Sequence, residues 1–221
     1  TAMEILHNDP SIPHGELYCC FVPDEEVGLC GAKSIDFSKF PVAFAYTIDC
    51  CELGEVVFQT FNAGSGRVHI KGRTAHPMNS KNNVINPCMI ATDIINMFDR
   101  AATPEHTEDT EGYIWVTGIR CDALNGEVDL NIRDHSKAKY EAKKEYIKAA
   151  VEMAKLKHPE AQISVELTDV YANIYDAVNE NNSKCIDYIY EAISRKGPEE
   201  YRKILMADVK DKERSDGVCI V

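Results

Sequence analysis

The amino-acid sequence predicts an α/β protein in which an α/β domain is interrupted by a compact ferredoxin-like insertion. Two observations predict this class. The first part of the chain alternates between helical, strand-like and loop-like stretches, and the middle has the order βαββαβ, which is that of the split ferredoxin-like sandwich. We therefore expect the outer domain at residues 1–62 and 173–221, with the insertion at residues 63–172.

The first part of the outer domain is expected to hold one helix and two buried strands. Residues 1–6 have a helical pattern, which proline and glycine residues interrupt shortly afterwards. Residues 16–22 and 43–48 are short apolar runs of the kind that form strands covered on both faces. Acidic residues follow both runs, at the edge where open α/β sheets place their ligands.

The insertion and the helix after it are predicted from hydrophobic periodicity. Strand-like alternation and helical spacing of apolar residues follow one another along this part of the chain. The expected strands are residues 67–71, 113–119, 127–132 and 163–167, and the expected helices are residues 84–98, 137–156 and 182–195. The highly charged residues 197–221 show no clear strand.

Composition and charge exclude several classes of protein. The chain has 24 Lys and Arg against 36 Asp and Glu, a net charge of −12, whereas binding to a phosphate backbone needs clustered basic residues. The uncharged stretches are too short to span a bilayer, and no signal peptide is visible. The nine cysteines are odd in number and lack CxxC spacing, so we expect reduced structural thiols in a cytoplasmic protein.

Four motifs carry side chains that are capable of catalysis or ligand binding. They are the acidic loop Pro23-Asp24-Glu25-Glu26, the strand-end Asp49, the loop histidine His76 and the strand-end pair Arg133 and Asp134. Taken singly, each has a simpler structural interpretation: a solvated turn, a turn or helix cap, a surface histidine and a salt bridge. The functional interpretation of the acidic loop is a metal-binding glutamate beside a second glutamate that acts as general base.

In combination and in this order, the motifs resemble the peptidase T branch of the M20 metallopeptidase family. The strings that carry the resemblance are Pro-Asp-Glu-Glu, Tyr-Thr-Ile-Asp, Gly-Arg-Thr-Ala-His-Pro and Ile-Arg-Asp, and it extends over residues 1–196. The resemblance implies a zinc-binding α/β catalytic domain with an inserted ferredoxin-like lid, through which two copies can form a homodimer. It also implies an aminopeptidase that releases the N-terminal residue from tripeptides.

The resemblance also implies a role for each candidate residue. Glu25 resembles the general base that deprotonates a metal-bridging water, Glu26 a ligand of one zinc ion, and Asp49 a ligand of the other. His76 resembles the lid histidine that polarises the scissile carbonyl or stabilises the oxyanion. Arg133 resembles the lid residue that binds the carboxylate end of the short peptide substrate, which suits a bidentate guanidinium.

The chain departs from the family pattern around the metal site. Cys50 and Cys51 replace two glycines expected after the ligand aspartate, and no histidine follows residues 214–217, where the family has its last ligand. We therefore expect a fragment whose two-zinc site needs ligands outside this chain and which has little turnover alone. Two alternatives stay open: another M20 amidohydrolase or carboxypeptidase, and a non-catalytic dimerisation or peptide-binding module.

Overall fold

The computed structural model describes residues 2–26, 28–39, 41–50, 55–180, 182–196 and 217–220. The chain divides into two compact units, Thr1–Ala45 and Tyr46–Val221, and each is described by itself. None of the described helices is both long and apolar enough to cross a membrane.

The first unit holds short helices joined by extended segments. Its helical elements are α1 (Ala2–Asn8), α2 (Cys30–Lys33) and the 3₁₀ turn η1 (Phe37–Lys39). Helix α1 confirms the first prediction, but the strand predicted at residues 16–22 is wrong. This segment forms no strand, and all seven of its residues are exposed, Phe21 to 91%. An apolar run becomes a strand only where a neighbouring strand pairs with its backbone, and the described residues provide none here.

The second unit begins with a small mixed sheet. Its strands are β1 (Tyr46–Cys50), β2 (Val56–Val57) and β7 (Gly217–Ile220), in the order β1-β7-β2. Strand β7 pairs antiparallel with β1 and parallel with β2. The predicted strand at 43–48 therefore exists but begins three residues later, and the expected burial on both faces is wrong, since Ile48 is 74% exposed.

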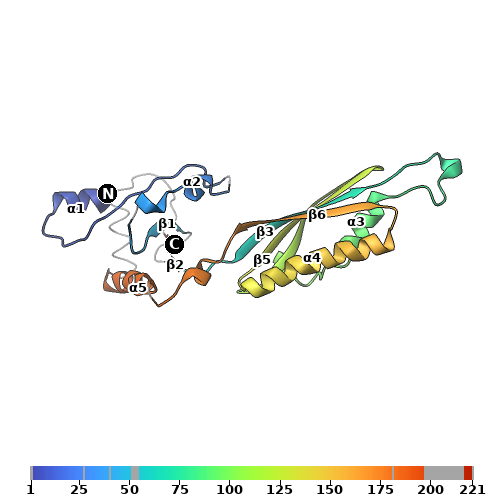
Figure 1. Ribbon diagram of the computed structural model, residues 1–221. Coiled ribbons are helices and arrows are strands. Elements are labelled where there is room, and N and C mark those ends of the chain that lie inside the picture. Colours follow the sequence, from blue (N-terminus) through green and yellow to red (C-terminus); the bar gives the residue numbers. More distant parts are fainter. Residues whose placement is uncertain are drawn as a thin grey trace, which may run out of the picture. The chain divides into compact units, whose positions relative to one another are not determined.

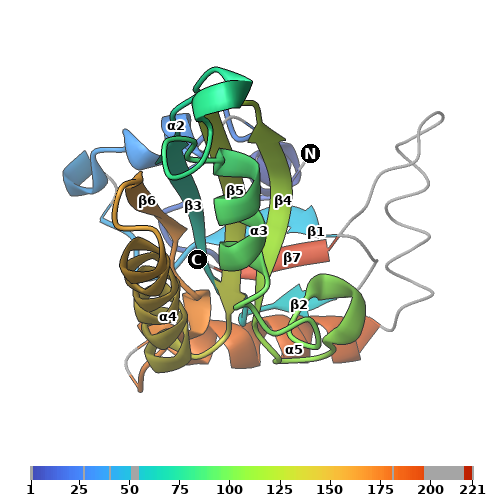
Figure 2. The same cartoon turned by 90° about the vertical axis from the view of Figure 1, so that its right-hand side faces the viewer.

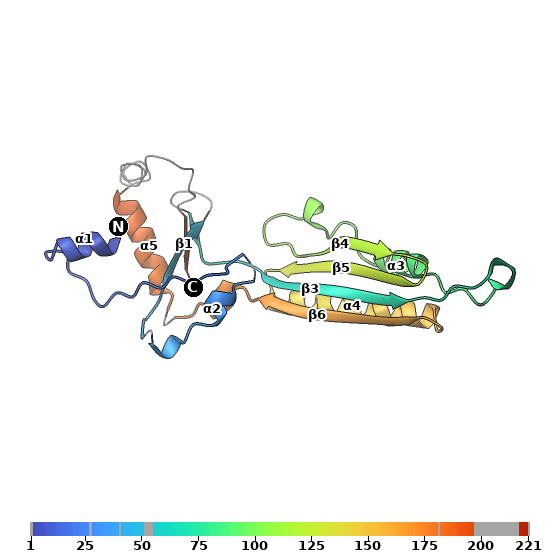
Figure 3. The ribbon, with the colours of Figure 1, turned by 90° about the horizontal axis from the view of Figure 1, so that it is seen from above.

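The larger sheet of the second unit confirms the order βαββαβ. Its strands are β3 (Asn62–Lys71), β4 (Tyr113–Cys121), β5 (Asn125–Asp134) and β6 (Gln162–Tyr171), and its helices are α3 (Pro87–Ile95) and α4 (Lys137–Lys157). The strand order is β4-β5-β3-β6 with every neighbour antiparallel (Figure 3). Both helices cover the same face of the sheet (Figures 1 and 2). We refer to this module, residues 62–171, as the lid.

Short 3₁₀ turns and one further helix complete the described chain. They are η2 (Pro77–Asn79), η3 (Pro104–His106), η4 (Ile174–Ala177) and α5 (Lys184–Lys196). Helix α5 confirms the helix predicted at residues 182–195. The hydroxyl of Tyr46 in β1 donates a hydrogen bond to the carbonyl of Cys185 in α5 at 2.9 Å, which ties this helix to the small sheet.

The core of the lid lies between the sheet and its two helices. Alternation along the central strands β3 and β5 directs every second side chain toward the helices. The fully buried aliphatic side chains on this side are Val68, Ile70, Ile90, Ile94, Val128, Leu130, Ile132, Ile147 and Val151. Both helices start at a capping side chain, since Asn86 Oδ1 accepts from the Cys88 amide and Ser136 Oγ accepts from the Lys139 amide.

Candidate functional site

The acidic loop of the first unit is a tight turn whose carboxylates face solvent. Asp24 has a φ of 61°, and its carbonyl accepts a hydrogen bond from the Cys30 amide at 3.2 Å. The carbonyl of Glu25 accepts from the amides of Gly28 and Leu29. Backbone hydrogen bonds therefore hold the turn in shape. The side chains of Glu25 and Glu26 take no part in them and are exposed to solvent.

The remaining predicted metal ligand, Asp49, lies in β1 of the second unit, and its side chain is outside the described part of the structure. Among the side chains that are described, no three His, Cys, Asp or Glu residues gather as a metal site. Protein zinc sites use three or four ligands, so the described carboxylates do not by themselves fit a zinc ion.

The side chain of Arg133 lies at one end of the lid sheet, where backbone carbonyls and aromatic rings hold it. It occupies β5 directly opposite Ala63 of β3, and its Nη1 donates to the carbonyl oxygens of Gly64 at 3.1 Å and Ile132 at 2.9 Å. The guanidinium carbon lies 5.6 Å from the ring centre of Phe61 and 5.9 Å from that of Tyr171. Two carbonyls and two aromatic rings thus orient the guanidinium.

The simple interpretation of Arg133 and Asp134 as a mutual salt bridge is wrong. Successive residues of a strand point to opposite faces, so Arg133 lies on the open face of the sheet while Asp134 turns toward α4. Asp134 is 1% exposed, and its Oδ2 lies 2.6 Å from Nζ of Lys143. Its Oδ1 accepts from the Ser136 amide at 2.9 Å, so the carboxylate also secures the start of α4.

His76 lies in the loop between β3 and α3, which extends beyond the end of the sheet (Figures 1 and 3). The side chain is exposed, and Nδ1 accepts a hydrogen bond from the Met78 amide at 3.3 Å. Reciprocal backbone hydrogen bonds between Arg73 and Ile85 close the loop at its base. The histidine therefore lies at the start of η2, in a loop that is closed at its base.

The structure does not bring His76 and Arg133 together within one copy of the lid. Arg133 pairs with Ala63 near the start of β3, whereas the loop of His76 leaves the sheet after Lys71. Lys71 lies eight residue steps after Ala63 along the strand, a distance of about 26 Å at 3.3 Å per residue. The two residues thus lie at opposite ends of the sheet.

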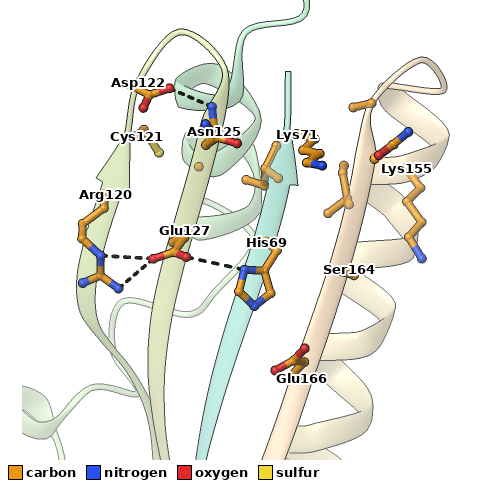
Figure 4. A pocket seen from close by; sticks show the side chains of 15 residues that line it. His69, Lys71, Arg120, Cys121, Asp122, Asn125, Glu127, Lys155, Ser164 and Glu166 are labelled. Atoms are coloured by element: carbon orange, nitrogen blue, oxygen red, sulfur yellow. Dashed lines mark hydrogen bonds and ion pairs between the residues drawn. The ribbon is translucent and has the colours of Figure 1, made fainter. Parts of the chain in front are cut away.

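A broad groove of about 1100 Å³ lies on the open face of the sheet, at the end away from Arg133 (Figure 4). Charged side chains of neighbouring strands pair across it: Arg120 contacts Glu127 at 3.1 Å and Asp129 at 2.6 Å. Arg67 also contacts Asp129 at 2.6 Å, and its hydrogen bond, followed by that of Arg120, holds the pKa of this carboxyl below its usual value. The charges on this face are thus paired with one another, and none of the predicted site residues lines this groove.

Phe61 and Tyr171 are the site residues that sequence reasoning missed. Phe61 directly precedes β3 and Tyr171 ends β6, and an aromatic residue at a strand end is the one signal that the sequence offers for them. Their partnership depends on the pairing of β3 with β5 and β6, which brings together residues that are far apart in the chain.

The chain is similar in sequence to known peptidases. Residues 58–159 match the M20 family described as the peptidase dimerisation domain. A peptidase T-like protein of Yersinia pestis is 46% identical over 82% of this chain and 44% of its own length. Peptidase T of Fusobacterium nucleatum is 38% identical over 81% of this chain and 43% of its own length. The chain thus spans about half the length of the curated relatives that it matches.

Two solved structures share the fold. Aminopeptidase PepT from Bacillus cereus superposes with a TM-score of 0.67 at 22% identity, over 78% of this chain and 46% of that one. A tripeptidase from Staphylococcus aureus superposes with a TM-score of 0.73 at 15% identity, over 99% of this chain and 58% of that one. At these identities the likeness concerns the fold, and it confirms the combination of a sheet-and-helix lid with further α/β elements.

Proposed function

Since this chain carries the M20 peptidase dimerisation domain and is related to peptidase T, as its motifs predicted, we propose that it belongs to a zinc-dependent aminopeptidase acting on tripeptides. The observation that carries the proposal is the extent of the relationship: 181 residues at 46% identity, well beyond the matched domain at 58–159. We further propose a cytoplasmic location and the domain limits 1–62, 63–172 and 173–221.

The acidic residues are proposed to serve the metal centre. Glu26 and Asp49 are metal ligands in this proposal, and further ligands must complete the site, because zinc needs more than two. Zinc, when bound, supplies a water whose pKa is lowered toward neutrality. Glu25 would be the general base beside such a metal, a role that suits a solvent-exposed carboxylate such as the one on this turn.

The hydrogen bond at His76 supports a role as donor to the reacting carbonyl. An imidazole that accepts a hydrogen bond at Nδ1 from the Met78 amide is neutral on that nitrogen. Its proton then lies on Nε2, which becomes an N–H donor on this exposed loop. A donor of this kind stabilises the negative charge that develops on a carbonyl oxygen during peptide hydrolysis.

Arg133 is proposed to bind the C-terminal carboxylate of the tripeptide. Its Nη1 is engaged by the carbonyls of Gly64 and Ile132, so the guanidinium is fixed before the substrate arrives. Its other N–H groups can form a charge-assisted pair with a carboxylate. A substrate with a free C-terminus is therefore preferred over one whose C-terminus is amidated.

The separation of His76 and Arg133 favours a homodimer as the active form. Arg133 and the loop of His76 lie at opposite ends of the sheet, about 26 Å apart along the strand. A peptide of three residues is too short to contact both residues of one copy of the lid. Two copies related by a two-fold axis can place His76 of one copy beside Arg133 of the other. The dimerisation domain at residues 58–159 supports such pairing.

A mixed dimer of two inactive variants is expected to regain activity. His76→Ala and Arg133→Ala are each expected to be nearly inactive, because every site lacks one group. In the mixed dimer one of the two sites has both groups, so activity should return to about half that of the wild type. The measurement is tripeptide hydrolysis by co-expressed, differently tagged copies of the full-length gene product.

The control for this experiment pairs His76→Ala with the double variant that lacks both side chains. This mixed dimer has no complete site and should stay inactive. If the first mixed dimer is equally inactive, each site takes both residues from one copy and the proposed arrangement is incorrect.

The function itself is tested by substrate choice. With added Zn²⁺, the full-length gene product is expected to cleave a tripeptide at its first bond, to cleave the C-terminally amidated tripeptide more slowly and to leave an N-acyl amino acid intact. Cleavage of the N-acyl amino acid instead would assign an amidohydrolase or carboxypeptidase. A zinc-free, inactive and stable dimer would assign a dimerisation module, the alternative that the matched domain also supports.

A further inference from the structure

Two cysteines from distant parts of the sequence meet at one end of the lid. Cys88 lies in the first turn of α3, and Cys121 is the last residue of β4. The Cys88 thiol lies 3.7 Å from the carbonyl oxygen of Asp122, the residue that follows Cys121. The nearby Cys88 is also one of the causes that raise the pKa of the Cys121 thiol.

Packing around Gly126 brings the end of β4 and the start of α3 together. A side-chain carbon at Gly126, the partner of Cys121 across the β4–β5 pair, would lie 3.1 Å from the Cys121 sulfur and also 3.1 Å from Cβ of Pro87. Pro87 directly precedes Cys88, so the start of α3 rests against the end of β4. Figure 4 shows Cys121 at this end of the sheet, next to Asp122.

We propose that Cys88 and Cys121 form a redox-modification site, in which a peroxide oxidises the two thiols to an intrachain disulfide. The thiolate of Cys88 attacks one oxygen of hydrogen peroxide, which breaks the O–O bond, gives a sulfenic acid on Cys88 and releases hydroxide. The Cys121 sulfur then attacks the Cys88 sulfur, and the sulfenic oxygen leaves as water. Altogether two thiols and one peroxide give one disulfide and two waters.

Exposure decides the order of the two steps. Cys88 is exposed, so peroxide reaches it first, whereas Cys121 is partly covered by the core of the lid. Burial, followed by the nearby Cys88, raises the pKa of the Cys121 thiol, and a protonated thiol is a poor nucleophile toward peroxide. Cys121 therefore acts as the resolving thiol.

This pair differs from the other cysteines that the structure describes. Cys19, Cys20 and Cys30 are exposed in the first unit, and Cys185 is buried in α5. Cys19 and Cys20 are adjacent in the chain, which makes them poor disulfide partners. The described cysteines are thiols, but Cys19, Cys20, Cys30 and Cys88 are exposed and so do not pack into a core as structural thiols would. Of these, Cys88 is the one whose thiol lies next to Asp122, the residue that follows Cys121.

The position of the disulfide gives it a mechanical consequence. It would fasten the first turn of α3 to the end of β4, directly after the loop that carries His76 and closes at Arg73 and Ile85. Oxidation would thus restrain one end of that loop. This inference concerns the thiols alone and holds whether or not the chain is part of a peptidase.

Peptide mapping tests the proposal directly. The reduced chain is treated with hydrogen peroxide, the remaining thiols are alkylated, and the protein is digested with trypsin without reduction. Trypsin releases residues 82–100 and 121–133, and each of these peptides contains one cysteine. The expected product is these two peptides joined, with a mass about 2 Da below the sum of the reduced peptides, since two hydrogens are lost. Dithiothreitol should separate them.

Matched variants and a gel decide the outcome. Cys88→Ser should abolish the linked peptide, while Cys19→Ser, which removes another exposed thiol, should leave its yield unchanged. On a non-reducing gel the linked peptides should come from the monomer band. The proposal is overturned if both peptides are recovered alkylated at a peroxide dose that oxidises Cys19, or if the linkage occurs only in a covalent dimer.

Discussion

Replacement of Glu25 by alanine is expected to lower kcat for tripeptide hydrolysis by about 10²–10⁴-fold, the usual contribution of a general base. The substitution should leave the turn intact, because the carbonyl of Glu25, not its side chain, accepts the hydrogen bonds from Gly28 and Leu29. KM and the zinc content should change little, since Glu25 is proposed as a base and not as a ligand. The measurements are steady-state kinetics and metal analysis of the full-length gene product.

The neighbours of Glu25 provide matched controls. Asp24→Asn removes an adjacent charge but keeps a residue type that tolerates the positive φ of this position, so kcat should stay close to that of the wild type. Glu26→Gln should instead lower the zinc content, because Glu26 is proposed as a ligand. If Glu25→Ala retains full activity, Glu25 has no part in proton transfer.

Replacement of Asp134 by alanine is expected to destabilise the chain by about 3–5 kcal/mol, as for the removal of one partner from a buried ion pair. The side chain of Lys143 is only 20% exposed and would lose its counter-ion, which is 2.6 Å away. The Ser136 amide at the start of α4 would lose its acceptor as well. Urea-induced unfolding of this chain, followed by circular dichroism, measures the loss as a lower midpoint.

An exposed ion pair on the same helix gives the comparison. Glu145 and Lys148 of α4 are 2.7 Å apart but 68% and 53% exposed. Glu145→Ala should therefore cost less than about 1 kcal/mol. Asp134→Ala combined with Lys143→Met should recover part of the loss, because no buried charge is then left unpaired. Equal effects of Asp134→Ala and Glu145→Ala would show that burial adds nothing to the pair.

The elements of the lid could be predicted because their signals are local. Alternation in residues 127–132 and helical spacing in residues 137–156 each lie within one element, and β5 and α4 confirm them with slightly wider limits. The predicted strand at residues 16–22, which the structure does not contain, shows the limit of prediction from local pattern. Its apolar pattern is equally clear, but a strand also needs a partner, which local pattern does not supply.

The βαββαβ order, the family relationship and the identity of the candidate residues could all be predicted from the amino-acid order, because spacing and side-chain chemistry are properties of the chain. The contacts between distant residues became visible only in the folded chain: Arg133 is held by Phe61 and Tyr171, Asp134 pairs with Lys143, and the Cys88 thiol lies next to Asp122, which follows Cys121. The fold also separates His76 from Arg133 by the length of β3. The physical reason is that strand register and helix packing join residues far apart in the chain, so which side chains meet is set by the whole fold.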